Sequence, residues 1–136
     1  MTDLAPRTDP AERQVSALVV DDEALIRWSV AETLTTMGIA VVQASDAASA
    51  IDRIKNAATP FDVVVLDLRL PDMNDLTLLR QVRQLLSGAF VLLMTAFGTP
   101  EIMAEATAIG ANAILVKPFE LEKLTELVSR RSGPNP

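Results

Sequence analysis

Short runs of apolar residues alternate along the chain with longer segments in which apolar residues recur at helical spacing. The runs predict strands buried on both faces, and the longer segments predict amphipathic helices. The predicted strands lie near residues 18–20, 40–44, 63–66, 90–94 and 114–116. The predicted helices lie near residues 24–37, 46–57, 76–86, 100–109 and 120–130. Five successive strand–helix units predict an α/β fold with a parallel sheet and helices on both of its faces.

The apolar positions within the helices indicate which side of each helix faces the sheet. The first helix has a stripe at Ile26, Val30, Leu34 and Met37, the third at Leu79, Val82 and Leu86, and the last at Leu121, Leu124 and Val128. Each stripe is expected to point inward. The fourth helix differs because it carries small residues, namely Ala104, Ala106 and Ala108. Small side chains bury little apolar area, so this helix is expected to be weakly anchored and easy to displace.

Polar residues follow four of the predicted strands at the point where each strand ends. They are Asp21 and Asp22, then Asp67, Thr95 and Lys117, in that order along the chain. The carboxyl ends of parallel strands meet at one edge of the sheet, which is where such folds bind ligands. Each of these residues alone would more often be a solvated turn, a helix cap or a surface charge. Their joint placement predicts a functional site.

Three carboxylates close together repel one another unless a cation or a proton offsets their charge. Mg²⁺ is a suitable cation because it prefers carboxylates, waters and phosphate oxygens as ligands. A metal beside a carboxylate that can act as a nucleophile favours phosphoryl transfer, with Asp67 as the acceptor. The chain has no histidine and cannot form a phosphohistidine, so the phosphoryl donor must be another molecule.

Four segments of the chain resemble the receiver domains of bacterial two-component response regulators. The similarity covers about residues 17–130, and the segments are LVVDDE at 18–23, VVLDLRLPD at 64–72, MTA at 94–96 and VKPF at 116–119. The resemblance implies a CheY-like, flavodoxin-like (βα)5 fold with strand order 2-1-3-4-5. It also implies a regulatory domain that promotes its own phosphorylation and dephosphorylation at Asp67, and not an enzyme acting on other substrates.

The same resemblance implies roles for individual residues. Asp67 would receive a phosphoryl group from a sensor histidine kinase or a phosphotransfer protein. Mg²⁺ would be bound by Asp22, Asp67 and the backbone carbonyl of Arg69, with Asp21 acting through a metal-bound water. Thr95 and Lys117 would bind the phosphoryl oxygens, and the peptide between Lys117 and Pro118 would be cis. Receivers of this kind also form phosphorylation-dependent homodimers, which is an expectation here as well.

Two positions depart from the family pattern, and both bear on switching. Asp75 stands where the family usually has glycine, so the preceding loop is expected to be rearranged, since aspartate adopts a positive φ only at some steric cost. Ile114 replaces the usual aromatic residue and has no ring to rotate inward. Any switch is therefore expected to run from Thr95 through the following loop into the fourth helix, near residues 101–109.

Trp28 lies about 200° around the first helix from the apolar stripe and is expected to face solvent. It is either an anchor for the phosphoryl donor, because kinases of this family dock on that helix, or a residue that packs against a neighbouring helix.

Length and composition bear on the domain boundaries, the kinds of site, the partners and the location of the protein. The 136 residues fit one receiver domain at 15–131, with a flexible leader at 1–14 and a tail or linker stub at 132–136. The absence of cysteine excludes disulfides and thiolate metal sites. A net charge of −6 argues against direct nucleic-acid binding. Without a visible signal peptide or an apolar membrane span, the chain is expected to be a cytoplasmic bacterial protein.

Three other functions share part of this pattern. A flavodoxin would need phosphate-binding groups in its first loop, where Asp21 and Asp22 would repel an anion. A phosphatase of the haloacid dehalogenase type needs a second acid two residues after its nucleophile, but that position holds Arg69, which cannot act as a general acid. A degenerate receiver that binds partners constitutively stays open because of Asp75 and Ile114, although all five site residues are present.

Overall fold

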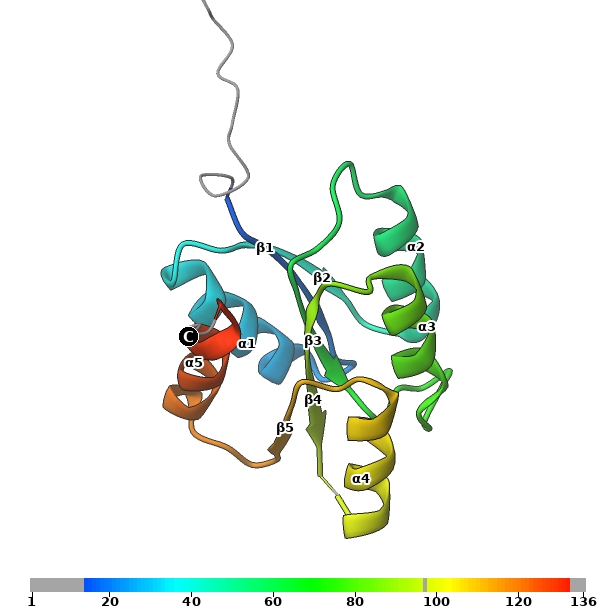
Figure 1. Cartoon of the computed structure of the whole chain (residues 1–136). Helices are drawn as coiled ribbons and strands as arrows, with labels where there is room; N and C mark the ends of the chain where they lie inside the picture. The colour runs from blue at the N-terminus through cyan, green and yellow to red at the C-terminus, as the bar shows by residue number, and fades with distance from the viewer. Residues whose placement is uncertain (1–13, 97, 133–136) are drawn as a thin grey trace, which may run out of the picture.

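The computed structural model describes residues 14–96 and 98–132, which form alternating strands and helices (Figure 1). The predicted leader and tail therefore lie outside the described residues, apart from Gln14 and Ser132. The strands are β1 (Ser16–Val20), β2 (Ala40–Ala44), β3 (Val63–Asp67), β4 (Phe90–Thr95) and β5 (Ala113–Val116). The helices are α1 (Ala24–Thr36), α2 (Ala47–Asn56), α3 (Thr77–Leu85), α4 (Pro100–Ile109), α5 (Leu121–Ser129) and the 3₁₀ helix η2 (Arg130–Ser132).

The five strands form one parallel sheet in the order β2-β1-β3-β4-β5, which confirms the predicted fold. Strand β3 lies at the centre between β1 and β4, and all five of its residues are buried. Its run of branched apolar side chains suits a strand that is covered on both faces. The order reverses direction between β1 and β3, so the carboxyl ends of these two strands flank the crevice where ligands bind in such sheets.

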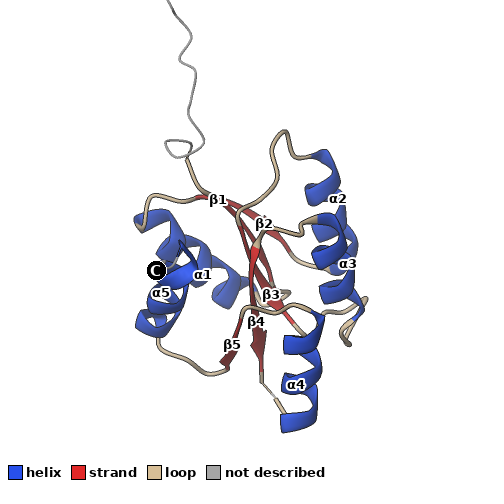
Figure 2. Ribbon diagram, viewed as in Figure 1, coloured by secondary structure: helices blue, strands red, loops and turns tan. Residues whose placement is uncertain are grey.

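Helices cover both faces of the sheet, with α1 and α5 on one side and α2, α3 and α4 on the other (Figure 2). On the first side, Val30 and Leu34 of α1 and Leu124 and Val128 of α5 are fully buried against alternate residues of the strands. On the second side, buried residues of α2 and α3 pack against the remaining strand residues. None of the helices in the described ranges combines the length and apolar character that a membrane crossing requires.

The predicted inward stripes are correct with one exception, Leu121. This side chain is 40% exposed, whereas Leu124 and Val128 on the same helix are fully buried. Leu121 is the first residue of α5 and lines an open cleft instead of the core. Helical spacing predicts the direction of a side chain from the helix axis, but not whether a neighbouring element covers the end of the helix.

Candidate functional site

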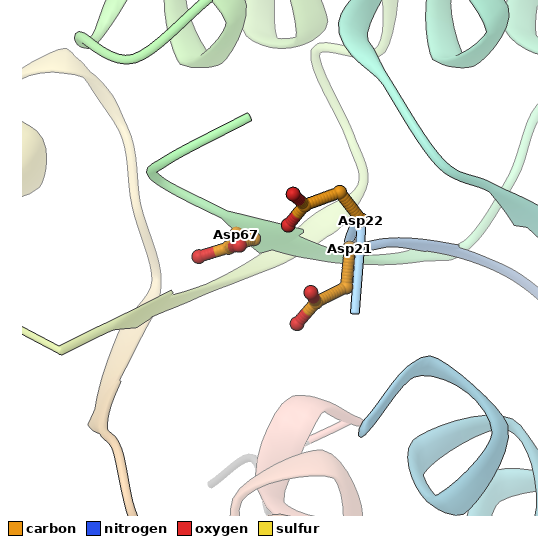
Figure 3. A group of neighbouring side chains, drawn as sticks. All are labelled: Asp21, Asp22 and Asp67. Atoms are coloured by element: carbon orange, nitrogen blue, oxygen red, sulfur yellow. The ribbon is translucent and has the colours of Figure 1, made fainter. Parts of the chain in front are cut away.

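Three carboxylates gather at the carboxyl edge of the sheet (Figure 3). Asp21 directly follows β1, Asp22 is the next residue, and Asp67 is the last residue of β3. One oxygen atom from each of the three lies within 4.8 Å of the others. Asp21 and Asp67 are buried while Asp22 is exposed, so the cluster has a protein side and a side open to solvent.

Lys117 reaches this cluster from the residue that follows β5. Its Nζ lies 3.0 Å from an oxygen of Asp21, 3.5 Å from an oxygen of Asp67 and 3.3 Å from an oxygen of Glu23. Burial alone would lower the pKa of Lys117, but the hydrogen bond to Asp21 and the charges of Asp67 and Asp21 raise it overall. The lysine is therefore a permanent cation that faces the carboxylates.

The electrostatics of the site are most unusual at Asp67. Burial, and then the neighbouring charge of Asp21, raise the pKa of Asp67 to about 6, although Lys117 and the backbone N–H of Arg69 act in the opposite direction. One lysine thus does not neutralise the acidic cluster. A carboxylate held in this way favours a nearby cation, and it keeps an oxygen atom available as a nucleophile.

The donor atoms at the site suit a hard divalent cation. Asp21, Asp22 and Asp67 offer only oxygen, and a doubly charged ion together with Lys117 would balance their three negative charges. Because Asp22 opens to solvent, water or phosphate oxygens could complete an octahedral shell, which is how Mg²⁺ is usually held in proteins. The residues present therefore fit the predicted metal.

Two hydrogen bonds fix Asp21 at the start of α1. The carboxylate of Asp21 accepts a bond of 2.8 Å from the N–H of Glu23, and its carbonyl accepts a bond of 2.8 Å from the guanidinium of Arg27. Both bonds tie the loop after β1 to the first turn of α1. The position of Asp21 is thus set by local structure as well as by Lys117.

Thr95 and Ile114 lie on adjacent strands beside the cluster. Thr95 ends β4 and is buried, and its carbonyl accepts a hydrogen bond of 2.8 Å from the N–H of Lys117. Val116 is in register with Thr95 at the end of β5, so Lys117 follows one residue beyond it. Ile114 is partly buried and packs against the core on the side of α4. The peptide between Lys117 and Pro118 is cis, as predicted.

Comparison with known proteins places this arrangement in a family. Residues 17–129 match the family model described as the response regulator receiver domain. The chain belongs to the response regulator receiver domain family. It is therefore a regulatory domain of two-component signalling, as the four sequence segments indicated, and the flavodoxin and phosphatase alternatives are set aside.

Individual receivers and response regulators are similar over most of the chain. It is 29% identical to the chemotaxis protein CheY of Bacillus subtilis over 114 residues, which are 83% of this chain and 93% of that protein. It is 37% identical to the two-component response regulator PhoP of Pseudomonas aeruginosa over 120 residues, which are 85% of this chain but 52% of PhoP. The chain thus spans about half the length of that relative.

A solved structure gives the same picture of the fold. The crystal structure of the CheX–CheY–BeF₃–Mg²⁺ complex from Borrelia burgdorferi has a TM-score of 0.80 and 25% sequence identity. The match covers 88% of this chain and 90% of the Borrelia chain. The receiver fold is therefore shared across the whole sheet and its helices.

Every site residue predicted from the sequence except Trp28 lies at the carboxyl edge of the sheet or next to it. Trp28 lies on α1 and is 57% exposed, as expected, close in sequence to the more exposed Leu25. Leu25 and Leu121 line an open cleft of about 520 Å³ that extends to Glu23 and Lys117. An apolar surface therefore lies directly beside the acidic site.

Sequence reasoning missed two features of this receiver. Glu23 pairs with Lys117, although its place in the sequence indicated no role of its own. Asp75 lies one residue before the N-cap of α3, and it accepts a hydrogen bond of 2.9 Å from the N–H of Thr77, the first residue of that helix. An aspartate just before a predicted helix is a capping signal, so this role of Asp75 could have been recognised from the sequence.

Proposed function

We propose that this receiver accepts a phosphoryl group on Asp67 from a histidine kinase or a phosphotransfer protein, in a reaction that requires Mg²⁺. The observation that carries the proposal is the cluster of Asp21, Asp22 and Asp67, with oxygens within 4.8 Å of one another and Lys117 at its edge. The Borrelia relative, whose complex contains CheX, BeF₃ and Mg²⁺, supports the choice of metal.

The proposed reaction is a direct transfer between two side chains. A carboxylate oxygen of Asp67 attacks the phosphorus of a phosphohistidine, an O–P bond forms and the N–P bond breaks. The imidazole, protonated on its other nitrogen, leaves as a neutral ring. The donor must be external because the chain has no histidine.

This chain's own residues orient the transferred group. Asp21, Asp22, Asp67 and the carbonyl of Arg69 would hold Mg²⁺, which when bound offsets negative charge on the phosphoryl oxygens. Lys117 supplies a fixed positive charge that already lies 3.5 Å from Asp67. Thr95 supplies a hydroxyl at the end of the adjacent strand. The hydroxyl and the ammonium group can each donate a hydrogen bond to a phosphoryl oxygen.

The surface next to the site suits docking of the donor. Leu25 is 74% exposed, Trp28 57% and Leu121 40%, and large exposed apolar side chains of this kind often anchor protein partners. The structural change on phosphorylation would then pass through Thr95 and the loop that leads to α4, since Ile114 offers no ring to move. A phosphorylation-dependent homodimer is part of the same proposal.

Acetyl phosphate, a small-molecule donor, tests the acceptor without knowledge of the kinase. Parent protein with Mg²⁺ should gain the mass of one phosphoryl group, and Asp67→Asn protein, or parent with a metal chelator, should gain none. Sedimentation of the same samples tests whether the labelled form dimerises. Labelling of Asp67→Asn protein to the same extent would overturn the assignment of the acceptor.

The alternative of a constitutive binding module makes a different prediction for the same samples. Such a module would gain no phosphoryl group from acetyl phosphate. Its backbone NMR spectrum would also be unchanged by beryllium fluoride and Mg²⁺. The proposed receiver should instead show shifts within Pro100–Ile109, and no shifts there would refute the route through α4.

The docking surface is tested by Trp28→Ala. This change removes an exposed side chain, so the fold should be retained and labelling by acetyl phosphate should be unchanged. Transfer from a phosphorylated histidine kinase or phosphotransfer protein should be slower. Equal rates of transfer to the parent and the variant would count against docking at Trp28.

A further inference from the structure

The loop between β3 and α3 carries Arg69 and is tied to α2 by a single side chain, Asp72. One carboxylate oxygen of Asp72 accepts a hydrogen bond of 2.8 Å from the N–H of Ala47, and the other accepts one of 3.0 Å from the N–H of Ala48. The partners are 25 and 24 residues apart in sequence. We call this pair of bonds the Asp72 clasp.

The clasp completes the N-terminus of α2. The first four N–H groups of a helix have no partner within the helix. Here the N–H groups of Ala47 and Ala48 donate to Asp72 and that of Ser49 donates to the carboxylate of Asp46, before the regular helical bonds begin at Ala50. One of these three cap bonds is thus local to α2, and the other two come from a different loop. That division makes it possible to separate the two roles experimentally.

Both ends of the clasp are held in place. Helix α2 is anchored to the sheet by the buried side chains of Ala47, Ala50 and Ile54. At the other end, Asp72 lies in a tight turn in which Leu70 and Met73 exchange backbone hydrogen bonds of 3.1 and 3.2 Å. The hydrogen bond from Ala47, and then that from Ala48, lower the pKa of Asp72. Its carboxylate is therefore ionised at neutral pH and favoured by the dipole of α2.

The clasped turn leads directly back to the acidic site. Arg69 precedes Leu70, the first residue of the turn, and its N–H lies 3.4 Å from an oxygen of Asp67. Its backbone therefore lies beside the carboxylate cluster, between Leu68 and Leu70, whose side chains are buried in the core. Hydrogen bonds also join this part of the loop to the rest of the fold, from the N–H of Leu68 to β4 and from the N-terminus of α2 to Asp72.

We propose that Asp72 is a positioning residue for the metal site, because its clasp on α2 holds the β3–α3 loop where the carbonyl of Arg69 can face the cation. This inference rests on the proposed function, since it assumes that Mg²⁺ binds at Asp21, Asp22 and Asp67. Asp72 does not touch the ion. Its effect is to restrict the conformations of the loop before the ion arrives, in the way that outer residues orient metal ligands.

The test is Mg²⁺ affinity, measured by calorimetry and by backbone NMR titration, with Asp46→Ala as the matched control. Asp72→Ala should weaken Mg²⁺ binding by about tenfold, at the low end of the range for residues that orient metal ligands. Asp46→Ala removes the other side-chain cap of the same helix and should destabilise the fold as well. Its Mg²⁺ affinity should stay within about twofold of the parent, because the described hydrogen bond of the Asp46 carboxylate is made within α2.

Asp72→Asn keeps the result interpretable if Asp72→Ala folds poorly. Asparagine retains one oxygen acceptor but presents an NH₂ group to the second N–H, so its Mg²⁺ affinity should be intermediate. Equal affinity of the parent, Asp72→Asn and Asp72→Ala proteins, or an equal loss in Asp46→Ala, would show that Asp72 is a helix cap alone and overturn the inference. If the parent itself did not bind Mg²⁺, the proposed function would fail first, and the inference with it.

Discussion

Helices α3 and α4 cover the same face of the sheet, but they are held differently. Helix α3 belongs to the β3–α3 unit that carries Asp67, and α4 belongs to the β4–α4 unit that carries Thr95. In α3, Leu78, Leu79 and Val82 are buried, whereas the only buried residue of α4 in the described chain is Ala106. Apolar burial is the main force that fixes a helix on a sheet. The proposed acceptor thus belongs to a firmly anchored unit, and the hydroxyl proposed to sense phosphorylation belongs to a loosely anchored one.

The two helices are nevertheless joined at one end. The guanidinium of Arg83 on α3 donates to the carbonyl of Gly110 at 2.6 Å and to the side chain of Asn112 at 2.9 Å, just after α4. It also donates to three carbonyls between α3 and β4. The C-terminal end of α4 is therefore fixed to α3, while its N-terminal end follows the loop after Thr95. A displacement of α4 should accordingly pivot about Gly110.

The largest expected effect on stability comes from a core substitution in α3, the firmly anchored helix. Leu79→Ala should lower the free energy of unfolding by about 2–5 kcal/mol, because it leaves a cavity in the core. Ala106→Gly in α4 should lower it by about 1–2 kcal/mol, from the loss of one methyl group and of helix propensity. Urea unfolding of both variants measures the difference. Equal losses would mean that α4 is as firmly anchored as α3.

The next effect concerns the charge buried in the anchored unit. Burial and Asp21 raise the pKa of Asp67 to about 6 from 3.8, so between these values the folded state binds more protons than the unfolded state. The free energy of unfolding should therefore fall as the pH rises from about 4 to about 6. Without metal, Asp67→Asn should be more stable than the parent by about 1–3 kcal/mol at pH 7 and equally stable near pH 4.

Thr95 in the β4–α4 unit provides the control for this pH dependence. Thr95→Val alters a buried side chain that carries no charge, so its difference from the parent should not vary between pH 4 and pH 7. Urea unfolding in the presence of a chelator follows all three proteins. An Asp67→Asn protein less stable than the parent at pH 7 would contradict the charge argument.

The smallest expected effect comes from removing the hydrogen bonds by which Arg83 connects the two units. Arg83→Ala should lower the free energy of unfolding by about 1–2 kcal/mol, because several carbonyl groups lose a charged donor. It should also speed amide exchange at Gly110 and Ala111, whose N–H groups close the end of α4. The matched control is Arg80→Ala, which removes only the exposed ion pair with Glu105 and should cost about 1 kcal/mol or less. Equal effects of the two substitutions would show that Arg83 does not join the units.

Much of this architecture was predictable because it depends on local pattern. Apolar runs predicted all five strands, and helical stripes and turn residues predicted all five α-helices to within a few residues. The convergence of Asp21, Asp67, Thr95 and Lys117 followed from one topological rule, that parallel strands end at the same edge. The exposure of Trp28 followed from its angle around α1.

Other features could not be predicted from local pattern. Leu121 has the spacing of a core residue but lies at an uncovered helix end. The bonds of Asp72 to α2 and of Arg83 to the segment after α4 join residues 24 to 29 positions apart. Neither sequence position carries a periodic signal, because a polar side chain outside the core finds its partner only after the backbone is in place.

The sequence by itself determined the fold, the family and the set of polar residues at the end of the strands, because periodicity and strand direction are properties of the chain. The tertiary structure alone decided how the site is charged and held. Burial beside Asp21 raises the pKa of Asp67, and distant side chains tie the β3–α3 loop to α2 and α4 to α3. Burial and long-range hydrogen bonds depend on which surfaces meet, and surfaces meet only when the elements pack.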